Sequence, residues 1–200
     1  MVNEVVRRLE GYQPRLPGHG GPLPQAAVLV PVIRSETPEL LLTLRASGLS
    51  THSGEVAFPG GRRDPEDADL MQTALRESQE EVGLDPGCVQ IAGSLSPLVS
   101  RHGIAVTPYV GIIPSGLTYC ANAAEIDSIF SAPLDFFAED CRETTHRIDY
   151  QGKSWYVPCY RFGEYKIWGL TAVMVVELVN LLYDRNLRLD VPPPLSRKEL

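Results

Sequence analysis

The segment from residue 54 to residue 84 combines a glycine pair with a helix that carries two chemically opposite faces. If this helix turns by about 100° per residue, the carboxylates of Glu77, Glu80 and Glu81 share an arc of roughly 100°. Apolar and small side chains fall on the other side, where they can pack against a core. Like charges at these spacings repel by about 0.2–0.5 kcal/mol per pair unless a cation lies among them. The pattern is typical of a metal site on a helix.

Short-range signals mark both ends of this helix. Asp64 can serve as the N-cap, Pro65 suits the first helical position, and Gly83 supplies a stop. The sequence therefore predicts a helix over residues 65–82, about 27 Å long.

Length and composition narrow the class of protein. With 200 residues and 44% hydrophobic content, the chain can bury one core, so we expect one domain over residues 25–185. An N-terminal extension, residues 1–24, and an extended C-terminal tail, residues 186–200, flank it. A net charge of −7 argues against nucleic-acid partners and anionic membranes.

The expected compartment follows from what the sequence lacks. No apolar run reaches the ~18 residues needed to cross a bilayer, and the N-terminus has no signal-peptide core. We therefore predict a cytoplasmic protein with no membrane partner. The four cysteines show no CxxC spacing, which favours reduced thiols.

Strand and helix patterns alternate along the chain. Residues 25–33 and 39–45 have the composition of paired strands, although Pro31 must fall at an edge or a bulge. Further strands are expected over residues 55–58, 89–100, 103–113 and 124–132, and a hairpin is expected around residues 151–152. Helices are expected over residues 1–12, 133–139 and 170–183, the last with an apolar stripe. The class is α/β, with a mixed sheet covered by helices.

The second half of the opening segment resembles the Nudix box. Every fixed position of the pattern R-E-x-x-E-E-x-G is present in Arg76-Glu77-Ser78-Gln79-Glu80-Glu81-Val82-Gly83. The first half is one position longer than the general pattern, and its acidic residue is Asp67. The resemblance implies the Nudix fold, a mixed β-sheet sandwiched between α-helices.

A second motif lies upstream and resembles the coenzyme A pyrophosphatase branch of that superfamily. The branch pattern is L-L-T-x-R-[S/A]-x3-R-x3-G-x3-F-P-G-G, and only its second arginine is missing, replaced here by Ser50. The matching residues are Leu41-Leu42-Thr43, Arg45-Ala46, Gly54 and Phe58-Pro59-Gly60-Gly61. The resemblance implies hydrolysis of coenzyme A to 3′,5′-ADP and 4′-phosphopantetheine, and Ser50 bears on the identity of the substrate.

Hard divalent cations such as Mg²⁺ or Mn²⁺ bind carboxylate oxygens together with substrate phosphates. Glu77 and Glu81, one turn apart, are the pair expected directly on the metal. Glu80 is expected to bind a second ion or to orient water. Arg76 borders the acidic face and is expected to orient Glu77 or Glu80.

The glycine pair is the first expected substrate contact. Gly60 and Gly61 permit a close approach of backbone to ligand, or simply form a turn between strand and loop. Arg45 can clamp a substrate phosphate or pair with an acidic residue at a strand edge.

Three further residues are weaker candidates. Glu125 opens a strand where some relatives supply an extra carboxylate, and its alternative is a structural hydrogen bond. Arg101 and His102 lie on a loop that could cover the site.

The predicted partner is a small nucleoside diphosphate derivative. Coenzyme A is the first substrate hypothesis; ADP-ribose or a dinucleotide is the alternative. A non-catalytic nucleotide-binding domain is disfavoured, because such domains typically lose box glutamates that this chain retains. The apolar stripe of the last helix is expected in the core, with a homodimer contact as the second possibility.

Overall fold

The computed structural model describes residues 2–16, 22–48, 54–150 and 153–189. The helices are α1 (Val2–Glu10), α2 (Leu70–Val82), the 3-10 turn η1 (Pro86–Cys88), α3 (Leu134–Ala138) and α4 (Gly169–Tyr183). The strands are β1 (Gln25–Arg34), β2 (Glu39–Arg45), β3 (Val56–Ala57), β4 (Gly60–Arg62), β5 (Gln90–Ser94), β6 (Leu98–Val99), β7 (Ala105–Pro114), β8 (Ile126–Pro133), β9 (Arg142–Tyr150), β10 (Lys153–Phe162) and β11 (Tyr165–Trp168).

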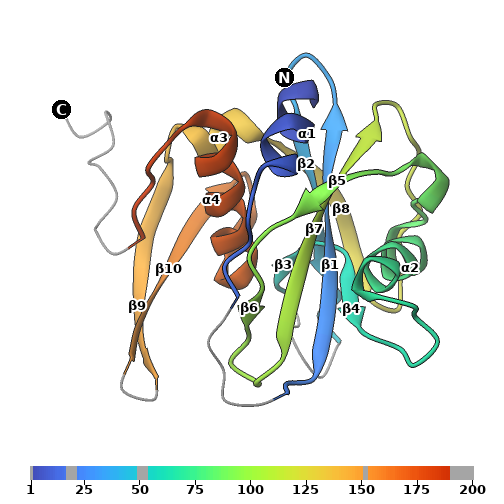
Figure 1. Ribbon diagram of the computed structural model, residues 1–200, viewed down its shortest axis with the longest axis horizontal. Coiled ribbons are helices and arrows are strands. Elements are labelled where there is room, and N and C mark those ends of the chain that lie inside the picture. Colours follow the sequence, from blue (N-terminus) through green and yellow to red (C-terminus); the bar gives the residue numbers. More distant parts are fainter. Residues whose placement is uncertain (1, 17–21, 49–53, 151–152, 190–200) are drawn as a thin grey trace.

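A mixed sheet forms the centre of the molecule (Figure 1). Its main order is β3-β2-β1-β7-β5, with β4 paired to β1, β6 to β7 and β8 to β2. Strand β1 runs parallel to β7 over its whole length and antiparallel to β2 and β4. The predicted hairpin of residues 25–33 with 39–45 is confirmed by the pairing of Val32 with Leu40.

Helices cover both faces of this sheet (Figure 1). Side chains alternate along the strands with a period of two, so that neighbouring residues enter different cores. Leu29 and Leu41 pack in the cluster beneath α2, whereas Val30 and Leu40 pack in the larger cluster with α1 and α4. The predicted class, a mixed sheet sandwiched between helices, is confirmed.

Pro31 lies inside β1, a strand with neighbours on both sides. The amide of Leu29 points toward β4 and donates to the carbonyl of Pro59 at 2.9 Å. The nitrogen of Pro31, two residues further along, faces the same side of β1. At this position β1 has no partner on that side, because its pairing with β4 ends at Val28 and its pairing with β2 begins at Val32. The missing N–H therefore costs no ladder hydrogen bond.

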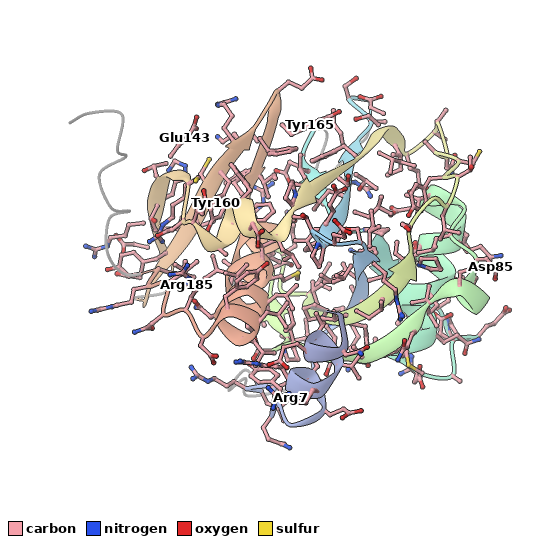
Figure 2. All side chains as sticks on the ribbon, turned by 90° about the horizontal axis from the view of Figure 1, so that it is seen from above. Arg7, Asp85, Glu143, Tyr160, Tyr165 and Arg185 are labelled. Carbon is pink, nitrogen blue, oxygen red and sulfur yellow. The ribbon has the colours of Figure 1, made fainter. Side chains whose placement is uncertain are left out.

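A second sheet, ordered β11-β10-β9, lies beyond α4. The predicted hairpin is confirmed as β9 and β10, but β11 and the separation of these strands from the main sheet were not predicted. In Figure 2, Tyr160 and Glu143 of this sheet lie on one side of the molecule, and Asp85, which follows α2, lies on the opposite side. Tyr160 is buried in the core cluster that contains the buried residues of α4. The ring of Phe130 in β8 stacks on that of Tyr165 in β11, with 3.7 Å between the ring centroids, so this pair connects the two sheets.

The prediction that α2 begins at Pro65 is wrong, since the helix begins at Leu70 with Asp69 as its N-cap. The Asp69 carboxylate accepts from the amide of Gln72 at 2.8 Å. The preceding residues form a turn because the Asp67 carboxylate points inward, where it accepts from the amide of Asp64 at 3.0 Å. The predicted stop at Gly83 is confirmed by its left-handed φ of 69°.

The ends of the domain are less simple than the sequence suggested. Helix α1 lies in the predicted N-terminal extension, yet its Val5 and Leu9 are buried in the larger core cluster. Residues 190–200 of the predicted tail lie outside the described part of the chain. Among the described residues, no helix is long and apolar enough to cross a membrane. All four cysteines are free thiols.

Candidate active site

Glu81 lies in the last turn of α2 and is almost fully buried, with 2% of its surface exposed. Its carboxylate accepts a hydrogen bond from Arg45 Nη1 at 2.9 Å and another from the amide of Gly60 at 3.0 Å. Burial raises the pKa of Glu81 to about 7, although these two donors act in the opposite direction. Glu81 is buried, although it belongs to the acidic face of the helix, because α2 presses this part of that face against β4.

Glu77 lies one turn earlier and is partly buried against the glycine pair. A Cβ atom at Gly61 would lie 2.4 Å from the Glu77 carboxyl carbon, so any side chain here would displace this carboxylate from its observed position. A Cβ atom at Gly60 would meet the carbonyl of Ala27 at 2.4 Å. The two glycines therefore allow β4 to lie between β1 and the acidic face of α2.

The pKa of Glu77 is also raised, chiefly by burial. The charges of Glu80 and Glu125 add to this shift, while the Arg76 guanidinium opposes it. Glu80 itself points outward, with 57% of its side chain exposed. The structure thus brings the predicted carboxylates to one surface with different degrees of burial.

Arg76 connects this acidic face to the turn before α2. Its guanidinium donates to both oxygens of Asp67 at 3.0 Å, to Glu77 at 3.0 Å and to Glu80 at 3.2 Å. Asp67 is buried and also accepts from the Thr73 hydroxyl at 2.8 Å. The Arg76 hydrogen bonds hold the pKa of Asp67 far below its usual range. Arg76 thus contacts both Glu77 and Glu80, and its role in orienting them stays a prediction.

Sequence reasoning missed the role of Asp67 as the anchor of Arg76. The only signal was its place as the acidic residue of the first half of the motif. Its separation of nine residues from Arg76 matches no helical spacing, and the contact exists because the intervening turn reverses the chain.

Arg45 reaches the site from the end of β2. Besides donating to Glu81, its Nη2 lies 3.9 Å from the Glu125 carboxylate. Two roles were predicted for Arg45. The geometry shows the pairing with acidic residues, whereas the contact with a substrate phosphate stays a prediction.

Glu125 lies in the turn that leads into β8. Its carbonyl accepts from the amide of Ala46 at 2.8 Å, and the nearby amide of Asn122 donates to the carbonyl of Glu81 at 2.9 Å. These backbone bonds hold the turn against the ends of β2 and α2.

Arg101 and His102 lie in the turn between β6 and β7. Arg101 Nε donates to His102 Nε2 at 3.2 Å, and the amide of His102 donates to the Ser100 hydroxyl at 3.3 Å. These contacts are local to the turn and do not link either side chain to the carboxylates. Ser50 lies outside the described residues.

A family model described as the NUDIX domain matches residues 23–135 of the chain. The chain belongs to the Nudix family. This membership agrees with the box on α2 and confirms the predicted enzyme class, a Nudix hydrolase.

The chain is similar to proteins named uncharacterized Nudix hydrolase NudL. The relative from Citrobacter koseri is 41% identical over 88% of this chain and 92% of its own length. The relative from Cronobacter sakazakii is 46% identical over 77% of this chain and 80% of its own. Among solved structures, a MutT/nudix family protein from Enterococcus faecalis matches 92% of this chain and 70% of its own with a TM-score of 0.55. At 13% identity that match shows a common fold.

Nudix hydrolases generally use divalent metal ions, and the donors at this site can be tested against that requirement. The carboxylates of Glu77, Glu80 and Glu81 supply only oxygen donors, which Mg²⁺ and Mn²⁺ prefer. Within the described ranges, no three acidic, histidine or cysteine side chains stand close enough together to enclose a cation. Arg45 and Arg76 instead bind oxygens of Glu81 and Glu77. The donor chemistry fits a divalent cation, which would compete with these guanidinium groups for the oxygens.

Proposed function

We propose that this Nudix hydrolase cleaves the diphosphate linkage of coenzyme A, or of its acyl or oxidised forms, with Mg²⁺ or Mn²⁺ as cofactor. Water attacks one phosphorus, the bridging P–O bond breaks, and the products are 3′,5′-ADP and the corresponding 4′-phosphopantetheine. The water's proton passes to a carboxylate of the site.

One observation carries the proposal. The upstream motif that resembles the coenzyme A branch supplies Arg45 and Gly60, and both donate hydrogen bonds to Glu81 of the box. The upstream motif and the Nudix box therefore contact each other at the buried carboxylate of Glu81. This convergence supports the view that the motifs belong to one site.

The contacts support the following roles for the residues. Glu77 and Glu81 would hold the cation, and Glu80, the more exposed carboxylate, would hold a second ion or orient water. Bound there, a divalent cation polarises the diphosphate and lowers the pKa of water. Arg76 keeps Glu77 and Glu80 in place through its anchor on Asp67. Arg45 positions Glu81, and its second nitrogen can meet a substrate phosphate.

A substrate panel tests the proposal. Purified protein with Mg²⁺ or Mn²⁺ would be offered coenzyme A, ADP-ribose, NADH and nucleoside triphosphates, and the products separated by chromatography. We expect release of 3′,5′-ADP from coenzyme A. Robust turnover of another substrate without that product would overturn the choice of coenzyme A and favour the alternative, another nucleoside diphosphate derivative.

The predicted homodimer is untested. The apolar residues at 172, 175, 176, 179 and 182 of α4 are buried within one chain, which confirms their core role. A dimer contact would therefore have to use other surfaces. Sedimentation analysis of the purified chain would decide the oligomeric state.

A further inference from the structure

Thr43 carries a buried hydroxyl group in β2, with 1% of the residue's surface exposed. Side chains alternate along a strand, so Thr43 shares its face of β2 with Leu41 and Arg45. Leu41 packs in the apolar cluster beneath α2, whereas Arg45 donates to Glu81 in the candidate active site. Thr43 therefore lies between the core and the site, where its hydroxyl requires a hydrogen-bond partner.

The partner of the Thr43 hydroxyl is the carbonyl of Ala57 in β3, which accepts at 3.0 Å. The two residues lie directly opposite each other in the ladder between β2 and β3. Because β3 consists of two residues, this ladder is short. The side-chain bond adds a connection between the strands at the end of β3, from which the chain runs toward the glycine pair.

The segment from Ala57 to Gly60 leads directly into the site. The carbonyl of Pro59 accepts from the amide of Leu29 at 2.9 Å, which attaches the segment to β1. The next residue is Gly60, whose amide donates to Glu81 Oε2 at 3.0 Å. A bond to β2 at one end and a bond to β1 at the other therefore hold the Gly60 amide in place.

The two oxygens of the Glu81 carboxylate have donors from different strands. Oε1 accepts from Arg45 Nη1 at the end of β2, and Oε2 accepts from the amide of Gly60 at the start of β4. The orientation of this carboxylate therefore depends on the spacing between the two donors. The bond from Thr43 to Ala57 joins β2 to the segment that carries the second donor, so it contributes to that spacing.

We propose that Thr43 is a positioning residue for hydrolysis, because its hydroxyl keeps the Gly60 amide in place relative to Arg45 and so keeps the Glu81 carboxylate oriented. The inference rests on the proposed role of Glu81 as a metal ligand, and it holds for whichever diphosphate is the substrate. Displacement of an active-site group by about 1 Å can cost ~10²-fold in rate. The bond to Leu29 remains without the hydroxyl, so the expected loss is smaller, about tenfold.

Two substitutions separate the hydroxyl from the rest of the side chain. Thr43→Val keeps the shape and the branching at Cβ but removes the donor, whereas Thr43→Ser keeps the donor. With the substrate that the wild type hydrolyses fastest, we expect Thr43→Val to lower kcat about tenfold with little change in KM. We expect Thr43→Ser to keep kcat within about twofold of the wild type. An unchanged kcat in Thr43→Val, or equal losses in both variants, would overturn the proposal.

Thr171→Val is the matched control, since the Thr171 hydroxyl also donates to a carbonyl of β3, that of Val56 at 3.1 Å. This bond comes from α4, on the face of the sheet opposite α2 (Figure 1). Both Val variants lose one hydrogen bond, so we expect each to lower Tm by about 2–4 °C. We expect kcat to decrease in Thr43→Val and not in Thr171→Val. An equal decrease in the control would overturn a specific role for Thr43.

Amide hydrogen exchange, followed by NMR, measures the position of the Gly60 donor without substrate or metal. We expect the Gly60 amide, which binds Glu81, to exchange about tenfold faster in Thr43→Val. Exchange should keep its wild-type rate in Thr43→Ser and in Thr171→Val. Unchanged exchange in Thr43→Val would overturn the proposal. Failure of the wild type to hydrolyse coenzyme A would instead overturn only the proposed substrate, since this measurement involves no turnover.

Discussion

The cluster of guanidinium and carboxylate groups around Arg142 and the one in the candidate active site are built differently. In the cluster beyond α3, the Arg142 side chain is 2% exposed and donates to Asp140 at 2.9 Å, to Thr145 at 3.2 Å and to the carbonyl of Arg188 at 2.9 Å. One charge faces one opposite charge, and the remaining contacts are neutral acceptors. In the candidate active site, carboxylates outnumber the two guanidinium groups. Burial raises the pKa values of Glu77 and Glu81, as it does that of Asp140, so the two clusters differ in their balance of charges and not in the direction of these shifts.

The difference shows how to tell a structural ion pair from a reactive one. A balanced pair with all its partners inside the chain contributes to the fold, and removing one member leaves a buried charge uncompensated. An excess of partly buried carboxylates holds unrelieved repulsion, which a cation would offset. The following variants test this distinction, from the largest expected effect to the smallest.

Glu81→Gln should reduce turnover by about 10³-fold, because the site loses a proposed metal ligand. The amide has the same size and can still accept from Gly60. Since burial raises the pKa of Glu81 to about 7, the ionised carboxylate is less favourable in the folded chain than in the unfolded chain. We therefore expect no decrease in Tm at pH 8 in the presence of EDTA.

Steady-state kinetics and thermal unfolding of the same preparation check both parts. A large decrease in Tm would show that the fold depends on the Glu81 charge. Full activity of Glu81→Gln would show that Glu81 is not a metal ligand.

Arg142→Ala should lower the free energy of unfolding by about 3 kcal/mol, because Asp140 keeps its burial and loses its partner. Turnover per folded molecule should not change. Urea unfolding and active-enzyme kinetics measure these quantities. Arg161→Ala is the control: Arg161 pairs with Glu143 at 2.7 Å on the surface, where both side chains are about half exposed, and no change in stability is expected.

Gly61→Ala should reduce kcat/KM by about 10²-fold, because the new methyl group would displace the Glu77 carboxylate. Gly11→Ala is the matched control, since a Cβ atom there meets nothing within 4 Å. Unchanged kinetics in Gly61→Ala would show that Glu77 works from another position.

Asp67→Asn should cost about 2 kcal/mol of stability at pH 7 and should lower activity through Arg76. The folded chain lowers the Asp67 pKa, so its stabilisation is present above the ordinary aspartate pKa and is lost as the pH falls. The stability difference between wild type and variant should therefore begin to shrink below about pH 4. Asp64→Asn is the control, because its carboxylate is largely exposed and lies 3.8 Å from Arg76. A pH-independent difference would argue against the ion pair.

Much of the local structure could be predicted because its causes lie within a few residues. The end of α2 at Gly83, the hairpin of β1 with β2 and the apolar stripe of α4 depend on periodicity and turn chemistry. The start of α2 could not be predicted, since Asp64 and Pro65 form a good cap locally. The competing contact of Asp67 with Arg76 comes from nine residues away.

The sequence by itself determined the family, the acidic face of α2 and the candidate residues, because these are encoded in composition and short spacing. Only the tertiary structure decided that Glu81 is buried, that Arg45 and Gly60 hold it, and that β9, β10 and β11 form a second sheet. Each of these depends on packing between elements far apart in the chain. Such contacts balance burial, charge and steric fit at once, and no single stretch of residues carries that information.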